Sequence, residues 1–166
     1  SLLLLPHKEQ FKNLFDLYFE HIRRYLYYRC GDTALSTDLA QDTFMRIWEK
    51  QMDVRPGKDT GLLYKIAGDL FVSFTRREKL RKEAPEQIRF EQQSLSPEEE
   101  LQFRELQNKY ERVLMKLPEN QRVVFLMSRT EELSYKEIAT RLSLSVKAIE
   151  KRMSGALARL RKELKT

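Results

Sequence analysis

The sequence predicts an all-α protein made of two small helical domains joined by a linker, with a helix-turn-helix in the C-terminal domain. Its 166 residues include only five Gly and five Pro, and apolar residues recur at helical spacing over long stretches. A polar and weakly periodic segment, residues 83–95, separates the two halves. The net charge of +6 lies entirely in residues 134–166, which contain nine basic and three acidic residues. We therefore expect domains at 1–83 and 98–166, with residues 84–97 as the linker.

Composition and cysteine content narrow the classes of protein. Cys30 is the only cysteine, which excludes an internal disulfide and fits a reducing cytosol, so we expect a cytoplasmic protein. His7 and His21 are the only histidines, so the chain offers no recognisable metal site, and we expect no metal or cofactor. Residues 2–5 are too short for a signal peptide or a membrane span, and no membrane insertion is expected. No motif indicates an enzyme, whereas the pI near 9.4 is compatible with a polyanionic partner.

The first domain is expected to begin with two amphipathic helices. Residues 8–29 carry an aromatic-rich stripe at helical spacing, which we assign to the core, and Gly31 then ends the pattern. Residues 36–51 bury one side around Phe44 and Trp48. The opposite side gathers polar residues around one methionine: Asp38, Gln41, Asp42, Met45, Arg46 and Glu49. This face is either ordinary solvated surface or a docking surface for a partner helix, and periodicity alone favours ordinary surface.

A third helix is expected from Thr60, its cap, to about residue 82. Tyr64 and Phe71 lie seven residues apart on one flank. Cations crowd the end of the helix: Arg76, Arg77, Lys79, Arg81 and Lys82. Aromatic rings beside such cations can stack unpaired bases while the cations hold the phosphate backbone. Cations at a helix C-terminus are also favoured by the helix dipole alone. The segment by itself therefore leaves nucleic-acid binding and an ordinary solvated helix equally open.

The second domain opens with a helix that starts at Pro97, where Ser96 and Glu99 complete a capping box. Apolar residues then recur along this helix: Leu101, Leu106, Tyr110, Val113, Leu114 and Leu117. Pro118 begins the next helix, which leads into the helix-turn-helix.

The predicted helix-turn-helix occupies residues 134–164. Ser134 and Glu137 form a capping box, and Ser145 is a suitable N-cap for the long basic helix that follows a tight turn. The side of this helix opposite its apolar stripe carries Lys147, Glu150, Lys151 and Ser154. Such a helix can place its N-terminal half against base edges in the major groove while basic residues around it contact phosphates. The alternative is a solvated amphipathic helix that ends a bundle, but the capping box, short turn and charge asymmetry together favour DNA binding.

Four separated stretches resemble one family. Residues 38–48 (DLAQDTFMRIW) and 63–67 (LYKIA) resemble region 2 of bacterial sigma factors of the extracytoplasmic-function type. Residues 117–125 (LPENQRVVF) are similar to the opening of region 4, and LSYKEIA followed by SVKAI is similar to its helix-turn-helix. Response-regulator output domains share the helix-turn-helix of region 4, whereas the two regions in this order and at this spacing are highly specific. The chain departs from the family at Leu62, often Trp, at Asp69, usually Asn, and at Ser143, usually Gly.

The resemblance implies a transcription initiation factor without enzymatic activity. The face formed by Asp38, Gln41, Asp42, Met45, Arg46 and Glu49 would dock on the clamp helices of the β′ subunit of core RNA polymerase. Residues 64–82 would meet the −10 promoter element and help to melt it, through Tyr64, Phe71, Arg76, Arg77 and Lys79. In the long basic helix, Lys147, Glu150, Lys151 and Ser154 would read the −35 element, while Arg152 and Arg159 hold the DNA backbone. The family also implies an inhibitory anti-sigma factor as a partner.

The sequence leaves two other functions open, and each predicts a different binding behaviour. A stand-alone helix-turn-helix transcription regulator, with residues 1–95 as a sensing or dimerising domain, would bind duplex DNA without polymerase, usually as a dimer. A helical adaptor that binds only protein would show no salt-dependent DNA binding.

Overall fold

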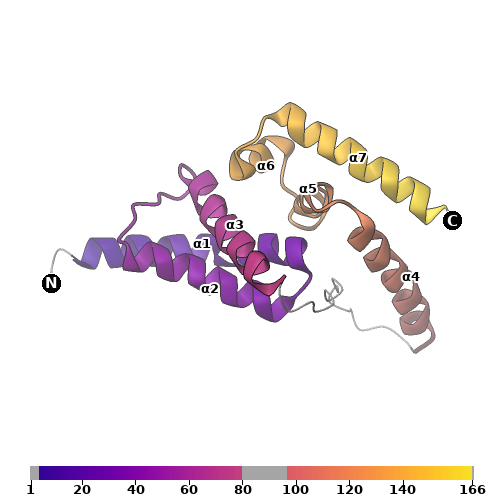
Figure 1. Cartoon of the computed structure of the whole chain (residues 1–166), viewed down its shortest axis with the longest axis horizontal. Coiled ribbons are helices and arrows are strands. Elements are labelled where there is room, and N and C mark those ends of the chain that lie inside the picture. The colour runs from indigo at the N-terminus through magenta and orange to yellow at the C-terminus, as the bar shows by residue number, and fades with distance from the viewer. Residues whose placement is uncertain (1–3, 80–96, 166) are drawn as a thin grey trace.

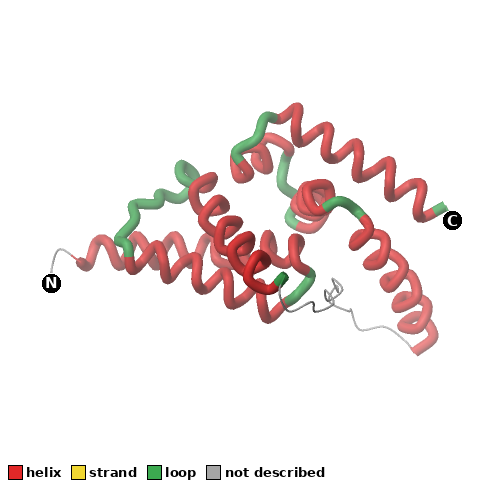
Figure 2. The backbone as a smooth tube through the Cα atoms, in the orientation of Figure 1, coloured by secondary structure: helices red, strands yellow, loops and turns green. Residues whose placement is uncertain are grey.

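The computed structural model describes residues 4–79 and 97–165, and within them it contains seven α-helices and no strand (Figures 1 and 2). The helices are α1 (Leu4–Cys30), α2 (Thr33–Glu49), α3 (Thr60–Glu78), α4 (Pro97–Lys116), α5 (Glu119–Thr130), α6 (Tyr135–Leu142) and α7 (Val146–Leu164). The predicted all-α class is confirmed. The predicted linker, residues 84–97, lies outside the described residues except for Pro97, and the domain boundaries stay a prediction.

Helices α1 to α3 form the N-terminal domain, in which α2 runs back along α1 and α3 packs across both (Figure 1). The predicted aromatic core of α1 is confirmed around Phe44, which is 2% exposed. Rings of Phe11, Phe15 and Phe19 surround Phe44 with centroids 6.3, 5.2 and 5.8 Å away. Phe15 is nevertheless partly exposed, because it lies at the edge of an apolar groove beside Trp48.

Several helix boundaries differ from the prediction. α1 begins at Leu4 rather than at residue 8, and α2 ends at Glu49 rather than at residue 51. α2 begins at Thr33 rather than at residue 36, because the side chain of Asp32 caps it by accepting from the backbone N–H of Leu35. Thr60 is not the cap of α3 but its first residue, and Asp59 precedes it. The Asp59 carboxylate is engaged by Arg55 instead of by the helix. α3 ends at Glu78, four residues before the expected end.

Helices α4 to α7 form the C-terminal domain. Its core joins Ile138 of α6 to Val124 and Met127 of α5 and to Ile149 and Met153 of α7, all of which are buried. α4 begins at Pro97 as predicted, whereas its predicted cap, Ser96, lies outside the described residues.

The apolar pattern of α4 only partly marks a buried side. Leu101 and Leu106 are 60% and 66% exposed, and the buried part of this helix is its C-terminal end, at Val113 and Leu114. Only that end of α4 reaches the core formed by the other three helices.

Candidate nucleic-acid and protein interfaces

The turn before α7 follows the predicted capping pattern. Ser134 and Glu137 make the reciprocal capping box of α6, and the Ser145 hydroxyl accepts from the backbone N–H of Ala148 at 3.1 Å. Ser143 adopts the left-handed conformation with φ 55°. Backbone N–H groups of Ser143 and Leu144 donate to carbonyls of the last turn of α6, as in a Schellman motif. Ser143 therefore adopts the left-handed conformation that glycine adopts most easily. This turn fixes the angle at which α7 leaves α6.

The outward face of α7 presents four of the predicted DNA-contacting residues together. Lys147, Glu150, Lys151 and Ser154 are all exposed on the side opposite the buried stripe of Ile149, Met153, Ala156 and Leu160. The three charged side chains form no ion pair within the described part of the chain. They are therefore available to donate to guanine or to accept from cytosine in a major groove.

The two arginines predicted to hold the DNA backbone lie in different surroundings. Arg159 is exposed further along α7. Arg152 is only partly exposed and lines a cavity of about 390 Å³ together with Tyr25 and Arg29 of α1 and Glu119 of α5. In this conformation Arg152 therefore belongs to the boundary between the two domains and not to the outward face of α7.

The polar face of α2 is continuous and fully accessible. All six of its predicted residues are exposed: Asp38, Gln41, Asp42, Met45, Arg46 and Glu49. Met45 is 53% exposed, and beside it an apolar groove of about 640 Å³ runs between α1 and α2, lined by Phe11, Phe15 and Trp48. An exposed methionine next to aromatic rings offers a partner helix an adaptable apolar anchor within a polar surface.

The structure exposes some of the residues predicted to meet the −10 element and buries the others. Arg76, Arg77 and Lys79 are exposed at the end of α3. Tyr64 and Phe71 are buried, at 1% and 6% exposed, so the expected exposed flank of aromatics is wrong for this conformation.

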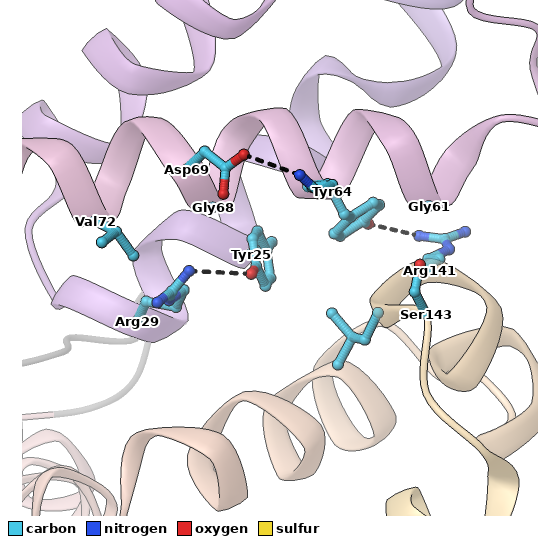
Figure 3. Close-up of a pocket in the computed structure, with 11 residues that line it drawn as sticks. Tyr25, Arg29, Gly61, Tyr64, Gly68, Asp69, Val72, Arg141 and Ser143 are labelled. Atoms are coloured by element: carbon cyan, nitrogen blue, oxygen red, sulfur yellow. Dashed lines mark hydrogen bonds and ion pairs between the residues drawn. The ribbon is translucent and has the colours of Figure 1, made fainter.

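Each of these two buried rings is in contact with an arginine. The Tyr64 hydroxyl accepts from Nη1 of Arg141, on α6, at 3.0 Å, and burial raises the pKa of that hydroxyl. The guanidinium of Arg29 lies 4.5 Å from the centre of the Phe71 ring (Figure 3 shows Arg29, Tyr64 and Arg141). Helical periodicity assigns a residue to a side of its own helix, but it does not reveal what the rest of the chain packs on that side.

Comparison with known proteins finds both halves of this architecture in one family. Residues 14–81 match the model of sigma-70 region 2, and residues 107–160 match that of sigma-70, region 4. The RNA polymerase sigma factor YlaC of Bacillus subtilis is 27% identical over 168 residues, which cover 96% of this chain and 95% of that protein. The chain belongs to the extracytoplasmic-function sigma factors.

Other relatives agree with this assignment. The ECF RNA polymerase sigma factor SigM of Bacillus subtilis is 25% identical to this sigma factor over 155 residues, covering 92% of this chain and 91% of that protein. The fold is also that of the sigma factor RpoE of Bartonella quintana, solved in complex with the anti-sigma factor NepR. That chain superposes with a TM-score of 0.68 at 24% identity, covering 94% of this chain and 97% of that one.

Sequence reasoning missed the arginines that join the two domains of this sigma factor. Arg122 is 6% exposed and donates to backbone carbonyls of α1, and Arg141 reaches Tyr64. The only sequence signal for Arg122 is its place in the stretch that resembles the opening of region 4. Nothing in the local pattern indicates that this cation would be buried.

The departures from the family at the α3 surface are both exposed. Leu62 is 40% exposed, and the Asp69 carboxylate lies 3.4 Å from Lys65 Nζ, one turn earlier on the helix. Lys65 therefore partly neutralises the acid that stands on this side of α3.

Residues 4–79 and 97–165, which the structure describes, contain no group of three or more His, Cys, Asp or Glu side chains arranged to hold a metal ion. None of their helices is long and apolar enough to cross a membrane.

Proposed function

We propose that this sigma factor binds core RNA polymerase in the cytoplasm and directs it to promoters through −35 and −10 elements, without cofactor or catalytic step of its own. The observation that carries the proposal is the presence of regions 2 and 4 in one chain, in that order, on two separate helical domains. A regulator that binds duplex DNA alone needs only the second of these domains.

Polymerase binding is proposed for the exposed face of α2. The carboxylates on this face belong to Asp38, Asp42 and Glu49. All three residues are exposed, so none of them packs in the core of the domain. Met45 stands among them as an apolar centre beside the groove at Trp48. A surface with an apolar centre and a charged rim suits a helical partner that carries basic side chains, and we propose the β′ clamp helices as that partner.

Promoter recognition is proposed for α7 and α3. Lys147, Glu150, Lys151 and Ser154 would read base edges of the −35 element in the major groove, while Arg159 contacts phosphates. At the −10 element, the exposed cations Arg76, Arg77 and Lys79 would hold the backbone, while Tyr64 and Phe71 would contact unstacked bases once they are uncovered. Arg152 would join the backbone contacts only after the domains separate.

An inhibitory protein is proposed as a further partner. The structurally similar RpoE was solved with the anti-sigma factor NepR, and the exposed α2 face and apolar groove of this chain give such a protein a surface to cover. An inhibitor bound there would compete directly with polymerase.

Co-elution with bacterial core RNA polymerase tests the proposal. The wild-type chain is expected to co-elute, and a variant carrying Asp38→Arg and Asp42→Arg is expected not to, because it reverses the charge of the proposed docking face. A variant carrying Glu98→Arg and Glu105→Arg is the control, since it makes the same change of charge at exposed positions of α4 and should co-elute like the wild type.

Three results would count against the proposal. Co-elution of all three proteins would remove the α2 face from the interface, and loss of binding in the control would reduce the effect to overall charge. If no form binds polymerase and the chain alone shifts duplex DNA, the chain acts as a stand-alone regulator.

A further inference from the structure

Two neighbouring cavities lie between the N-terminal and C-terminal domains of this sigma factor. The first, of about 350 Å³, is bounded by α1, α3 and α6, and we call it the α3 cavity. The second, of about 390 Å³, is bounded by α1, α5, the turn after α6 and α7, and we call it the α5 cavity. Both are lined by Tyr25, Arg29 and Leu142, which therefore form a shared wall. Cavities of this size can hold small organic ligands.

Small residues of α3 make room for the α3 cavity. A Cβ atom at Gly61 would lie 2.8 Å from Ser143 Oγ and 3.3 Å from the Thr140 carbonyl oxygen, so α3 and α6 meet closely at this end. Gly68 and Val72 follow on the same face of α3, where they also line the cavity (Figure 3). Their short side chains leave space between α1 and α3 that a ligand can occupy.

Positive charge predominates in the two cavities. Four cations line them against two carboxylates, and these six residues are Arg29, Lys65, Arg141, Arg152, Asp69 and Glu119. Each carboxylate already belongs to an ion pair, Asp69 with Lys65 and Glu119 with Arg29. The charges of Arg141 and Arg152 therefore have no acidic counterpart among the described residues, and a bound anion would supply one.

Two arginines keep donors free at the α3 cavity. A guanidinium carries several N–H donors in a planar fork, which matches the oxygens of a phosphate group. Arg141 uses Nη1 for the Tyr64 hydroxyl, at 3.0 Å. Arg29 uses Nε for Glu119 and Nη1 for the Tyr25 hydroxyl. Figure 3 shows Arg29 and Arg141 at opposite ends of the cavity, so a phosphate chain between them can accept from both.

The α5 cavity has an apolar wall in addition to its cation. This wall consists of Val123 of α5 together with Leu142 and Leu144. Arg152 lines the same cavity, and its side chain is partly exposed and forms no ion pair with a described residue. Guanidinium planes stack on flat rings, and the amide of Asn120, also in the lining, can bond to the polar edge of a base. These groups suit an aromatic ring better than a second phosphate.

We propose that the two cavities together form a binding site for a nucleotide. Its phosphates would lie in the α3 cavity between Arg29 and Arg141, and its base would lie against the apolar wall of the α5 cavity, beside Arg152. The site takes residues from both domains. It goes beyond the proposed function, and it does not depend on the promoter contacts assigned to α3 and α7.

Isothermal titration of the free full-length chain tests the site. ADP and GDP are the probes, while adenosine and inorganic pyrophosphate each carry only one half of the proposed ligand. All titrations are made at the same ionic strength, because charge interactions are screened by salt. At least one of the two nucleotides is expected to bind with one molecule per chain. Adenosine and pyrophosphate are expected to bind at least tenfold more weakly, because each occupies only one cavity.

Two variants and one control locate the binding. Arg152→Ala removes the unpaired cation of the α5 cavity and is expected to weaken nucleotide binding at least tenfold. Arg161→Ala removes the same side chain from an exposed position of α7, outside both cavities, and should bind like the wild type. Val72→Trp fills the α3 cavity without changing any charge, and it should also weaken binding at least tenfold. Circular dichroism and thermal unfolding check that all three variants are folded.

Each contrary result overturns the site or one part of it. If wild-type chain binds neither nucleotide, the proposal is wrong. Equal weakening by Arg161→Ala and Arg152→Ala would assign binding to the overall positive charge of α7. Pyrophosphate that binds as tightly as a nucleotide would remove the base from the α5 cavity, and wild-type affinity in Val72→Trp would remove the phosphates from the α3 cavity. These titrations contain neither polymerase nor promoter, so their failure leaves the proposed function unaffected.

Discussion

Lys151 is the residue on which the proposed base recognition depends most simply. It is exposed in the N-terminal half of α7, and its ammonium group can donate to guanine in the major groove. Lys151→Ala is expected to relax the sequence choice at one promoter position and to cost about 1–3 kcal/mol against the preferred base. Promoter selection from a random pool with the variant holoenzyme measures both effects.

Arg159→Ala is the matched comparison for this prediction. Arg159 is exposed further along the same helix, where we assign it to the phosphate backbone. Its loss should weaken all promoters alike and reduce the salt dependence of binding. If Lys151→Ala behaves in the same way, with no change of preference at any position, Lys151 is a phosphate contact and the assignment of base readout to it is wrong.

At the scale of single residues, the sequence predicted outward faces better than buried contacts. The periodicity of α7 places Lys151 opposite Met153, and the structure exposes the one and buries the other. The burial of Tyr64 is not predictable in this way, because its ring packs against Tyr25 of α1 and its hydroxyl accepts from Arg141, 77 residues later in the chain. Local spacing contains no information about such a partner.

The turn between α6 and α7 carries the clearest prediction at the scale of an element. Ser143 holds a left-handed conformation with φ 55°, which costs a residue with a side chain about 1 kcal/mol relative to glycine. Ser143→Gly is therefore expected to raise the free energy of unfolding by up to about 1 kcal/mol, which corresponds to a rise in Tm of roughly 2–4 °C for a chain of this size. Thermal unfolding of the full chain measures the shift.

Ser145→Ala is the comparison variant, and it is expected to lower the Tm rather than to raise it. The Ser145 hydroxyl caps α7 by accepting from Ala148 N–H, and its removal is expected to cost about 1 kcal/mol. If Ser143→Gly lowers the Tm as Ser145→Ala does, the contact of Ser143 with α3 outweighs its backbone strain.

Elements could be predicted where a capping residue stands beside a clear apolar pattern. Ser134 with Glu137 and Ser145 marked the starts of α6 and α7 correctly. The predicted start of α2 is too late, because the pattern breaks at Gly31 and the apolar spacing does not reveal that Asp32, the next residue, caps the following helix. The sequence predicts Thr60 as a cap because threonine can serve as one, whereas the structure buries it as the first residue of α3.

At the scale of the whole molecule, the relation between the domains could not be derived from the sequence. The sequence predicts both domains, but the contacts between them depend on Arg122, Arg29 and Arg141, whose partners lie on other helices. Arginine in an amphipathic helix is usually a surface residue, so its pattern predicts solvent and not a carbonyl of another domain.

Gly61→Leu is the substitution expected to open the whole molecule. Even a Cβ atom at this position would lie 3.3 Å from the Thr140 carbonyl oxygen, which is backbone and cannot rotate away, and a leucine extends further into the same space. The substitution should leave α3 intact, because leucine is a better helix former than glycine. Small-angle X-ray scattering of the free protein is expected to show a larger radius of gyration than for the wild type.

Glu105→Leu is the control for this experiment, because it adds the same side chain at an exposed position of α4. It should leave the radius of gyration unchanged, and both variants should keep the helical content of the wild type by circular dichroism. A wild-type radius in Gly61→Leu would mean that α6 accommodates the leucine without parting from α3, and that the contact between these two helices does not depend on the close approach at Gly61.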